Sequence, residues 1–98
     1  MVDEFSQDDK KLARYAKAMG HPVRVYILKL LSNRTHCYSG DLAEELQIAK
    51  STLSQHLKEL KDAGLIKGEI ELPKIRYCLN RRNWEEAIIL FSELFEQK

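Results

Sequence analysis

The chain is poor in cysteine, proline and glycine, and it has no long apolar run. Its 98 residues include two cysteines, two prolines and four glycines. Two cysteines are too few for the disulfide framework that stabilises many small secreted domains. The longest strongly apolar run, over residues 87–91, is far shorter than the roughly 20 residues that span a bilayer. We therefore expect neither a disulfide scaffold nor a membrane protein.

A targeting segment and an enzyme motif are also missing. Residues 1–5, MVDEF, are acidic and lack the apolar stretch of a signal peptide. There is no glycine-rich phosphate loop and no nucleophile motif, so we do not expect an enzyme. The hydrophobic fraction of 44% and the charged fraction of 32% are typical of a folded domain. We expect a single domain over residues 1–98, located in the cytoplasm.

The net charge of +1 hides a segregation of charge along the chain. Residues 10–34 carry seven basic residues and no acidic one, and residues 50–76 carry six bases against four acids. Such segregation creates local positive potential although the total is near zero. The same pattern also fits solvated helix faces, so the charge distribution alone does not show whether the protein binds nucleic acid.

Apolar residues recur at helical spacing at both ends of the chain. This spacing predicts helices over residues 8–19 and 22–32, separated by Gly20 and Pro22. A last helix is predicted over residues 83–97. His21, between the first two helices, is interpreted as a capping or packing residue rather than a ligand.

The middle of the chain predicts a helix-turn-helix followed by a β-hairpin. Ser39 is the expected N-cap of a short helix, the turn falls on residues 47–49, and the second helix ends before Gly64. The second helix buries its leucines at i, i+4 and i+7: Leu53, Leu57 and Leu60. Strands are predicted over residues 65–71 and 75–79, with a turn of Leu72, Pro73 and Lys74. The fold class is therefore mainly α with a small β-hairpin wing, a winged helix-turn-helix of order α-α-α-α-β-β-α.

The second helix of this pair begins with short polar side chains that can approach base edges in the major groove. Neighbouring lysines suit phosphates, and a basic hairpin suits the DNA backbone. The predicted DNA-binding residues are Lys50, Ser51, Thr52, Ser54, Gln55, His56, Lys58, Lys74 and Arg76. In the alternative interpretation the serines and threonine are helix caps, and the basic hairpin is only solvated. His56 either contacts DNA or covers the flank of its helix.

Three segments resemble a known family. Residues 16–31, AKAMGHPVRVYILKLL, resemble the ALGHPxRLxILxLL opening of the ArsR/SmtB family of bacterial winged-helix repressors. Residues 40–66, GDLAEELQIAKSTLSQHLKELKDAGLI, resemble its GDLAxxLGxSQSTVSHHLKxLxxAGLV core, and residues 76–79 fall at its wing strand. The resemblance implies a homodimeric repressor of double-stranded DNA, released by an effector that is often a metal or metalloid ion.

The resemblance also implies dimerisation through the first and last helices, residues 8–19 and 83–97. The aromatic content of the last helix supports this independently, because it exceeds what a small domain needs for its own core. The expected interface residues are Leu12, Tyr15, Trp84, Ile88, Phe91 and Phe95. Alternatively, the last helix packs only on its own domain. A dimer would bind a pseudo-palindromic operator.

The effector sites of the family are incomplete in this chain. The family's zinc site on the last helix uses Asp and His, but no histidine follows His56. Its thiolate site uses a Cys-x-Cys pair, of which this chain has Cys37, with Ser39 at the second position. The identity of any metal is therefore unknown from the sequence.

A second cysteine offers another pair. If residues 36–38 add a strand beside the second wing strand, Cys37 and Cys78 come close together. They would then form either a redox-labile disulfide or a site for a thiophilic metal or metalloid ion, completed by His36 or another group. Alternatively, Cys78 is a small buried hydrophobe. The runner-up function is a winged-helix protein-interaction module whose basic face meets an acidic partner without sequence-specific DNA binding.

Overall fold

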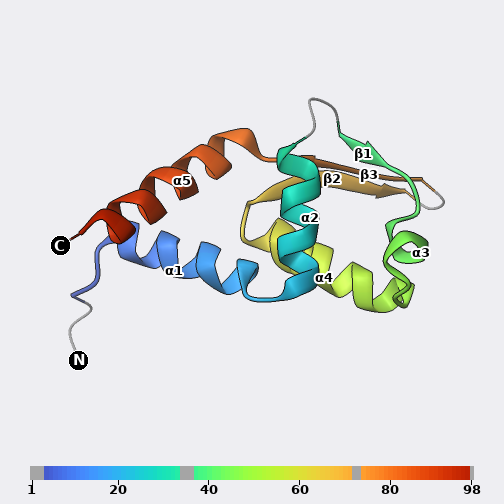
Figure 1. Cartoon of the computed structure of the whole chain (residues 1–98), viewed down its shortest axis with the longest axis horizontal. Coiled ribbons are helices and arrows are strands. Elements are labelled where there is room, and N and C mark those ends of the chain that lie inside the picture. The colour runs from blue at the N-terminus through green and yellow to red at the C-terminus, as the bar shows by residue number, and fades with distance from the viewer. Residues whose placement is uncertain (1–3, 34–36, 72–73, 98) are drawn as a thin grey trace.

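The structure, a computed structural model, describes residues 4–33, 37–71 and 74–97. Its elements, in chain order, are α1 (Gln7–Met19), α2 (Pro22–Ser32), β1 (Tyr38–Ser39), α3 (Leu42–Leu46), α4 (Lys50–Asp62), β2 (Ile66–Glu71), β3 (Lys74–Leu79) and α5 (Arg81–Glu96). The predicted winged helix-turn-helix is confirmed, with the short β1 in addition. In Figure 1, α1 and α5 extend together at one end, while α3, α4 and the sheet form the other.

Helix α2 has the predicted bounds, and α1 differs only in beginning at Gln7 instead of residue 8. Ser6 caps α1, because its hydroxyl accepts a hydrogen bond from the backbone N–H of Asp9 at 3.0 Å. Gly20 follows the last residue of α1, and Pro22 opens α2. The predicted capping role of His21 is confirmed, since its Nδ1 accepts a hydrogen bond from the N–H of Val23 at 3.1 Å.

Other predicted boundaries are wrong by one or two residues. Ser39 lies in β1, and Asp41 caps α3 instead by accepting a hydrogen bond from the N–H of Glu44 at 3.1 Å. Lys74 belongs to β3 rather than to the turn, and Leu72 and Pro73 lie outside the described residues. The last helix begins at Arg81 instead of residue 83, because Asn80 supplies its cap.

The three strands form one antiparallel sheet of order β1-β3-β2. Tyr38 of β1 pairs with Tyr77 of β3, and Gly68 of β2 pairs with the same residue on the other side. A Cβ at Gly68 would collide with the carbonyl oxygen of Arg76, so the close approach of these strands requires glycine there. Strand β3 is therefore the centre of the wing.

The core lies between the sheet and the helices. Every helix and every strand contributes to its buried cluster: Tyr15, Ala18, Ile27, Leu28, Leu31, Tyr38, Leu42, Ala43, Leu53, Leu57, Leu60, Leu65, Ile66, Tyr77, Leu79, Ala87 and Leu90. The predicted burial of the α4 leucines is confirmed, and Tyr77 and Leu79 are the residues that β3 contributes to the core. This packing decides which faces of α4 remain on the surface.

Candidate nucleic-acid interface

The start of helix α4 lies on the surface. Leu53, Leu57 and Leu60 are only 3%, 2% and 0% exposed, and they turn the opposite face of the helix outward. The predicted base-contacting side chains are all exposed: Ser51, Thr52, Ser54 and Gln55. A convex, polar helix start of this kind can enter a major groove.

No side chain that the structure describes caps the N-terminus of α4 or places a negative charge in its first turn. Its N-cap is Ala49, which offers no side-chain cap, and the first turn contains no acidic residue. The alternative in which the serines and threonine cap the helix is therefore not supported. The unpaired N–H groups and the positive end of the helix dipole remain available to a phosphate.

A tight turn fixes α4 against α3. Gln47 adopts the left-handed conformation, with φ 55° and ψ 45°. The N–H of Ile48 then donates a hydrogen bond to the carbonyl of Ala43 at 3.0 Å. The chain reverses within three residues, which places α3 behind the N-terminal turn of α4.

Basic side chains lie along both ends of α4. Lys50 is exposed at its first turn. Lys58 forms an exposed ion pair of 2.8 Å with Asp62, and this hydrogen bond raises the pKa of Lys58 and lowers that of Asp62. Because exposed pairs of this type are weak, Lys58 can exchange its partner for a phosphate. Lys61 instead donates to the carbonyl of Gly68 at 3.1 Å and ties α4 to β2.

The wing contributes Arg76, which is exposed on β3. Lys74 lies in the same strand, but its side chain is outside the described part of the chain. Strand β3 therefore alternates between a buried face with Tyr77 and Leu79 and an outer face with Arg76 and Cys78.

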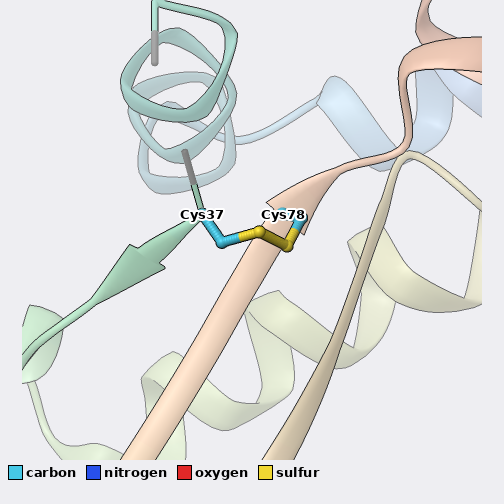
Figure 2. The surroundings of a disulfide bond; sticks show 2 residues. All are labelled: Cys37 and Cys78. Atoms are coloured by element: carbon cyan, nitrogen blue, oxygen red, sulfur yellow. A yellow bond between two sulfur atoms is a disulfide. The ribbon is translucent and has the colours of Figure 1, made fainter. Parts of the chain in front are cut away.

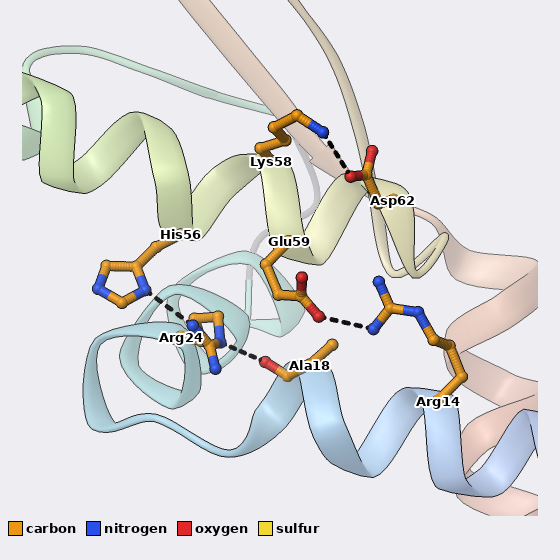
Figure 3. A network of polar contacts seen from close by, with 7 residues as sticks. All are labelled: Arg14, Ala18, Arg24, His56, Lys58, Glu59 and Asp62. Atoms are coloured by element: carbon orange, nitrogen blue, oxygen red, sulfur yellow. Dashed lines mark hydrogen bonds and ion pairs between the residues drawn. The ribbon is translucent and has the colours of Figure 1, made fainter.

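His56 lies on the flank of α4 that faces α2. Its Nδ1 accepts a hydrogen bond from Arg24 at 3.0 Å (Figure 3). Its ring centroid is 4.3 Å from that of His21. Burial lowers the pKa of His56, and the neighbouring His21 and Arg24 lower it further. Sequence reasoning missed Arg24, because its charge marked only a basic segment and gave no sign of a specific partner.

The conditional prediction for the cysteines is confirmed. Strand β1 pairs with β3, and this places Cys37 beside Cys78, with a Cα–Cα distance of 4.4 Å and a disulfide between them (Figure 2). His36, the predicted third group, lies outside the described residues. A disulfide offers no thiolate, and residues 4–33, 37–71 and 74–97 contain no cluster of three or more potential metal ligands. In this oxidised state the two cysteines therefore offer no thiolate to a metal ion.

The predicted interface residues of α1 and α5 divide into three groups by burial. Ile88 and Phe95 are 51% and 76% exposed, whereas Leu12, Trp84 and Phe91 are partly buried against the core. Tyr15 is only 5% exposed, so it belongs to the core of the single chain and offers almost no surface to a partner.

These features define a winged helix-turn-helix protein with an exposed recognition helix, a class that binds DNA. Residues 21–67 match the family described as "Bacterial regulatory protein, arsR family". The chain belongs to this ArsR family of DNA-binding transcriptional regulators. Among the described residues, no helix is both long and apolar enough to cross a membrane.

Individual relatives agree with this assignment. The HTH-type transcriptional regulator YgaV of Escherichia coli is 34% identical over 86 residues, which cover 88% of this chain and 87% of YgaV. CmtR of Mycobacterium tuberculosis is 37% identical over 71 residues, 72% of this chain and 59% of CmtR. The structure of reduced HlyU from Vibrio cholerae matches with a TM-score of 0.69 at 28% identity, covering 98% of this chain and 100% of HlyU. These relatives are regulators of transcription rather than enzymes.

Proposed function

We propose that this protein is a homodimeric repressor that binds a pseudo-palindromic operator through the N-terminal turn of α4. The observation that carries the proposal is the exposed start of this helix, whose hydroxyl and amide groups face outward while its leucines are buried. Gln55 and Ser51 read base edges, and Lys50 and Arg76 bind phosphates of the two strands.

The apolar surface of α5 supports the dimer. Ile88, Ile89, Leu94 and Phe95 are between 48% and 76% exposed. Two of them, Ile88 and Phe95, line a hollow of about 290 Å³ together with Met19, Trp84 and Phe91. An apolar helix face next to an apolar hollow suits a second copy of the same chain, because two-fold symmetry lets each copy fill the hollow of the other.

The dimer is tested by the association state in solution. Phe95→Glu places a charge on the exposed apolar face without disturbing the core, and we expect it to convert the dimer to a folded monomer in sedimentation equilibrium. Lys29→Glu, an exposed change on α2, serves as the control and should remain dimeric. A wild-type monomer at micromolar concentration would contradict the dimer.

DNA recognition is tested by titration at two salt concentrations. Wild-type protein first selects duplexes from a randomised library, and the enriched sequence, called here the selected duplex, is compared with random DNA. We expect a steep salt dependence for both and a preference of at least about a thousandfold for the selected duplex. Equal affinity for both would favour the protein-interaction module instead.

The cysteine pair supports regulation by thiol redox state rather than by a metal ion. Cellular compartments that hold DNA keep thiols reduced, so a disulfide there is transient rather than a permanent cross-link. Both cysteines are half-buried, and continuing the β1–β3 register by one residue beyond the Tyr38–Tyr77 pair places Cys37 opposite Cys78. Closing or opening the disulfide therefore needs little movement of the backbone.

Reduction would release the repressor from its operator. Two molecules of a low-molecular-weight thiol reduce the disulfide: the S–S bond breaks, each cysteine gains a proton and an electron, and the two small thiols form their own disulfide. The disulfide fixes β1 to β3 and orders the wing before DNA binds, so its loss costs affinity. Among the relatives, CmtR of Mycobacterium tuberculosis is a cadmium metal-sensor, and HlyU of Vibrio cholerae has a structure in its reduced form.

The redox step is tested on the selected duplex. We expect the oxidised protein to bind about five- to a hundredfold more tightly than the reduced protein, a typical range of coupling between two sites. The double variant Cys37→Ser with Cys78→Ser should bind like the reduced protein under both conditions. If cadmium or arsenite releases the reduced protein at stoichiometric concentration, a metal effector is supported instead.

A further inference from the structure

Helix α4 has a polar flank that neither reads DNA nor belongs to the apolar core. His56 and Glu59 lie one turn apart on this flank, and both are half-buried. Glu59 Oε1 accepts a hydrogen bond from Arg14 of α1 at 2.7 Å, and His56 Nδ1 accepts one from Arg24 of α2 at 3.0 Å. Figure 3 shows both contacts on the side of α4 that faces α1 and α2. Two cationic side chains therefore hold the recognition helix from behind.

Arg24 makes a second contact that links it to α1. Its Nε donates to the backbone carbonyl of Ala18 at 2.6 Å, in the last turn of that helix. The guanidinium has a rigid fork of N–H donors, so one planar group can serve both the Ala18 carbonyl and the His56 ring. Arg24 thus joins three helices: its own helix α2, the end of α1 and the recognition helix.

The protonation state of the histidine follows from these contacts. Because a guanidinium cannot accept a hydrogen bond, Nδ1 of His56 carries the lone pair and no proton. His21 is in the same form, since its Nδ1 accepts from the N–H of Val23. The two rings lie 4.3 Å apart, where two positive charges would repel each other. The junction is therefore built for neutral histidines.

We infer that Arg24 is a positioning residue for DNA recognition, which holds His56 so that α4 leaves α1 at a fixed angle. The inference rests on the proposed function, because only a dimer on two half-sites needs this angle. Both recognition helices must then fit grooves roughly 34–36 Å apart. A small rotation of α4 on α1 misplaces both helices at once. His56 receives the hydrogen bond from Arg24 that fixes α4, and it does not contact a base.

Two substitutions at position 56 test this directly. His56→Asn places an amide oxygen near the position of Nδ1, where Arg24 can still donate to it. His56→Gln places its amide near the position of Nε2, on the far side of the ring. We expect the Asn variant to bind the selected duplex within about twofold of wild type and the Gln variant about tenfold more weakly, with random DNA unaffected in both. The opposite order would mean that Nε2 contacts DNA, and it would overturn the inference.

Substitution of Arg24 separates positioning from phosphate binding. Arg24→Lys keeps the charge, but its ammonium cannot reach both the Ala18 carbonyl and His56 with the same geometry. We expect roughly tenfold weaker binding to the selected duplex with an unchanged salt slope. Lys29→Met, which removes a charge from an exposed position of the same helix, is the matched control and should keep the preference. A phosphate role for Arg24 would instead lower the salt slope by about one unit on Arg24→Met.

A readout without DNA separates this inference from the proposed function. The ¹⁵N chemical shifts of the His56 ring report which nitrogen carries the proton. We expect an unprotonated Nδ1 in wild type and a mixture of tautomers in Arg24→Lys, at a temperature well below the melting temperatures of both proteins. A protonated Nδ1 in wild type overturns the positioning link even if the protein prefers its selected duplex. Absence of that preference, with the expected tautomer, overturns the proposed function and leaves Arg24 as a purely structural residue.

Discussion

The hydroxyl of Tyr15 on α1 donates a hydrogen bond of 2.7 Å to the carboxylate of Glu86 on α5. Lys11 binds the other oxygen of the same carboxylate at 3.2 Å. These bonds lower the pKa of Glu86, that from Tyr15 more than that from Lys11. The two helices that carry the proposed dimer surface are therefore joined within one chain before a partner arrives.

Removing this hydroxyl should loosen the attachment of α5. Tyr15→Phe keeps the buried ring and deletes only the hydrogen bond to Glu86, so we expect a loss of about 1–2 kcal/mol in the free energy of unfolding. Urea denaturation of the monomer-forming Phe95→Glu background measures this without a contribution from association. Tyr26→Phe is the control, since Tyr26 is 41% exposed, and it should change stability by less than about 0.5 kcal/mol.

The same contact predicts how stability responds to alkali. Burial and the neighbouring Glu86 raise the pKa of Tyr15 from 10.0 to about 12. The contribution of Tyr15 is complete below pH 10 and is lost as the pH rises through 12, because the unfolded chain ionises first. Burial also raises the pKa of Tyr77, so we expect spectrophotometric titration to show late tyrosines, of which the one near pH 12 is absent from Tyr15→Phe. A wild-type chain whose four tyrosines all ionise near pH 10 would contradict this.

Local sequence patterns predicted the helices and the wing because residues close together in the chain determine where each element begins and ends. Leucine spacing located α4, and Gly64 ended it, as its φ of 82° requires. What the sequence did not reveal depends on contacts between distant elements. Ser39 was taken for a cap because its residue type suits one, but pairing with Arg76 recruits it into β1. The partner of His56, Arg24, lies 32 residues away, and no local pattern reports such a contact.

Base reading and phosphate binding should separate by mutation. Gln55→Ala removes a side chain that can hydrogen-bond a base edge, so it should reduce the preference for the selected duplex while leaving random DNA unchanged. Arg76→Ala should weaken both DNAs alike and lower the salt slope by about one unit. Fluorescence anisotropy at several salt concentrations gives both quantities. Equal effects of the two changes on all sequences would refute this division of roles.

Reduction of the disulfide should lower stability independently of DNA. Cys37 and Cys78 are 41 residues apart, and the loop they close contains α3, α4 and β2. Closing a loop of this length restricts the unfolded chain by about 3–4 kcal/mol. We expect the melting temperature to fall by more than about 10 °C on reduction. The doubly substituted Cys37→Ser with Cys78→Ser should melt like reduced wild type and ignore the reductant.

The junction between His56 and Arg24 predicts the direction of a pH effect on DNA binding. The pKa of His56 lies below its ordinary value of 6.5, first because the ring is buried and then because of His21 and Arg24. Protonation would put a hydrogen on Nδ1, which then faces the guanidinium instead of accepting from it. Stability from this group is therefore complete above pH 6.5 and is lost as the pH falls through the lowered pKa of the folded state.

The affinity for the operator should also decrease as the pH falls. The groups that face the ring are His21, which caps α2, and Arg24 of α2, with the Glu59–Arg14 pair one turn further along α4. We expect the affinity of wild type for the selected duplex to stay level from pH 8 to about 6.5 and to fall below it, with a smaller fall in His56→Asn. A histidine that touches phosphate would behave in the opposite way, because its protonation adds a positive charge at the DNA backbone. Affinity that rises on acidification in wild type, and not in His56→Asn, would place the ring on the DNA and contradict its role behind the recognition helix.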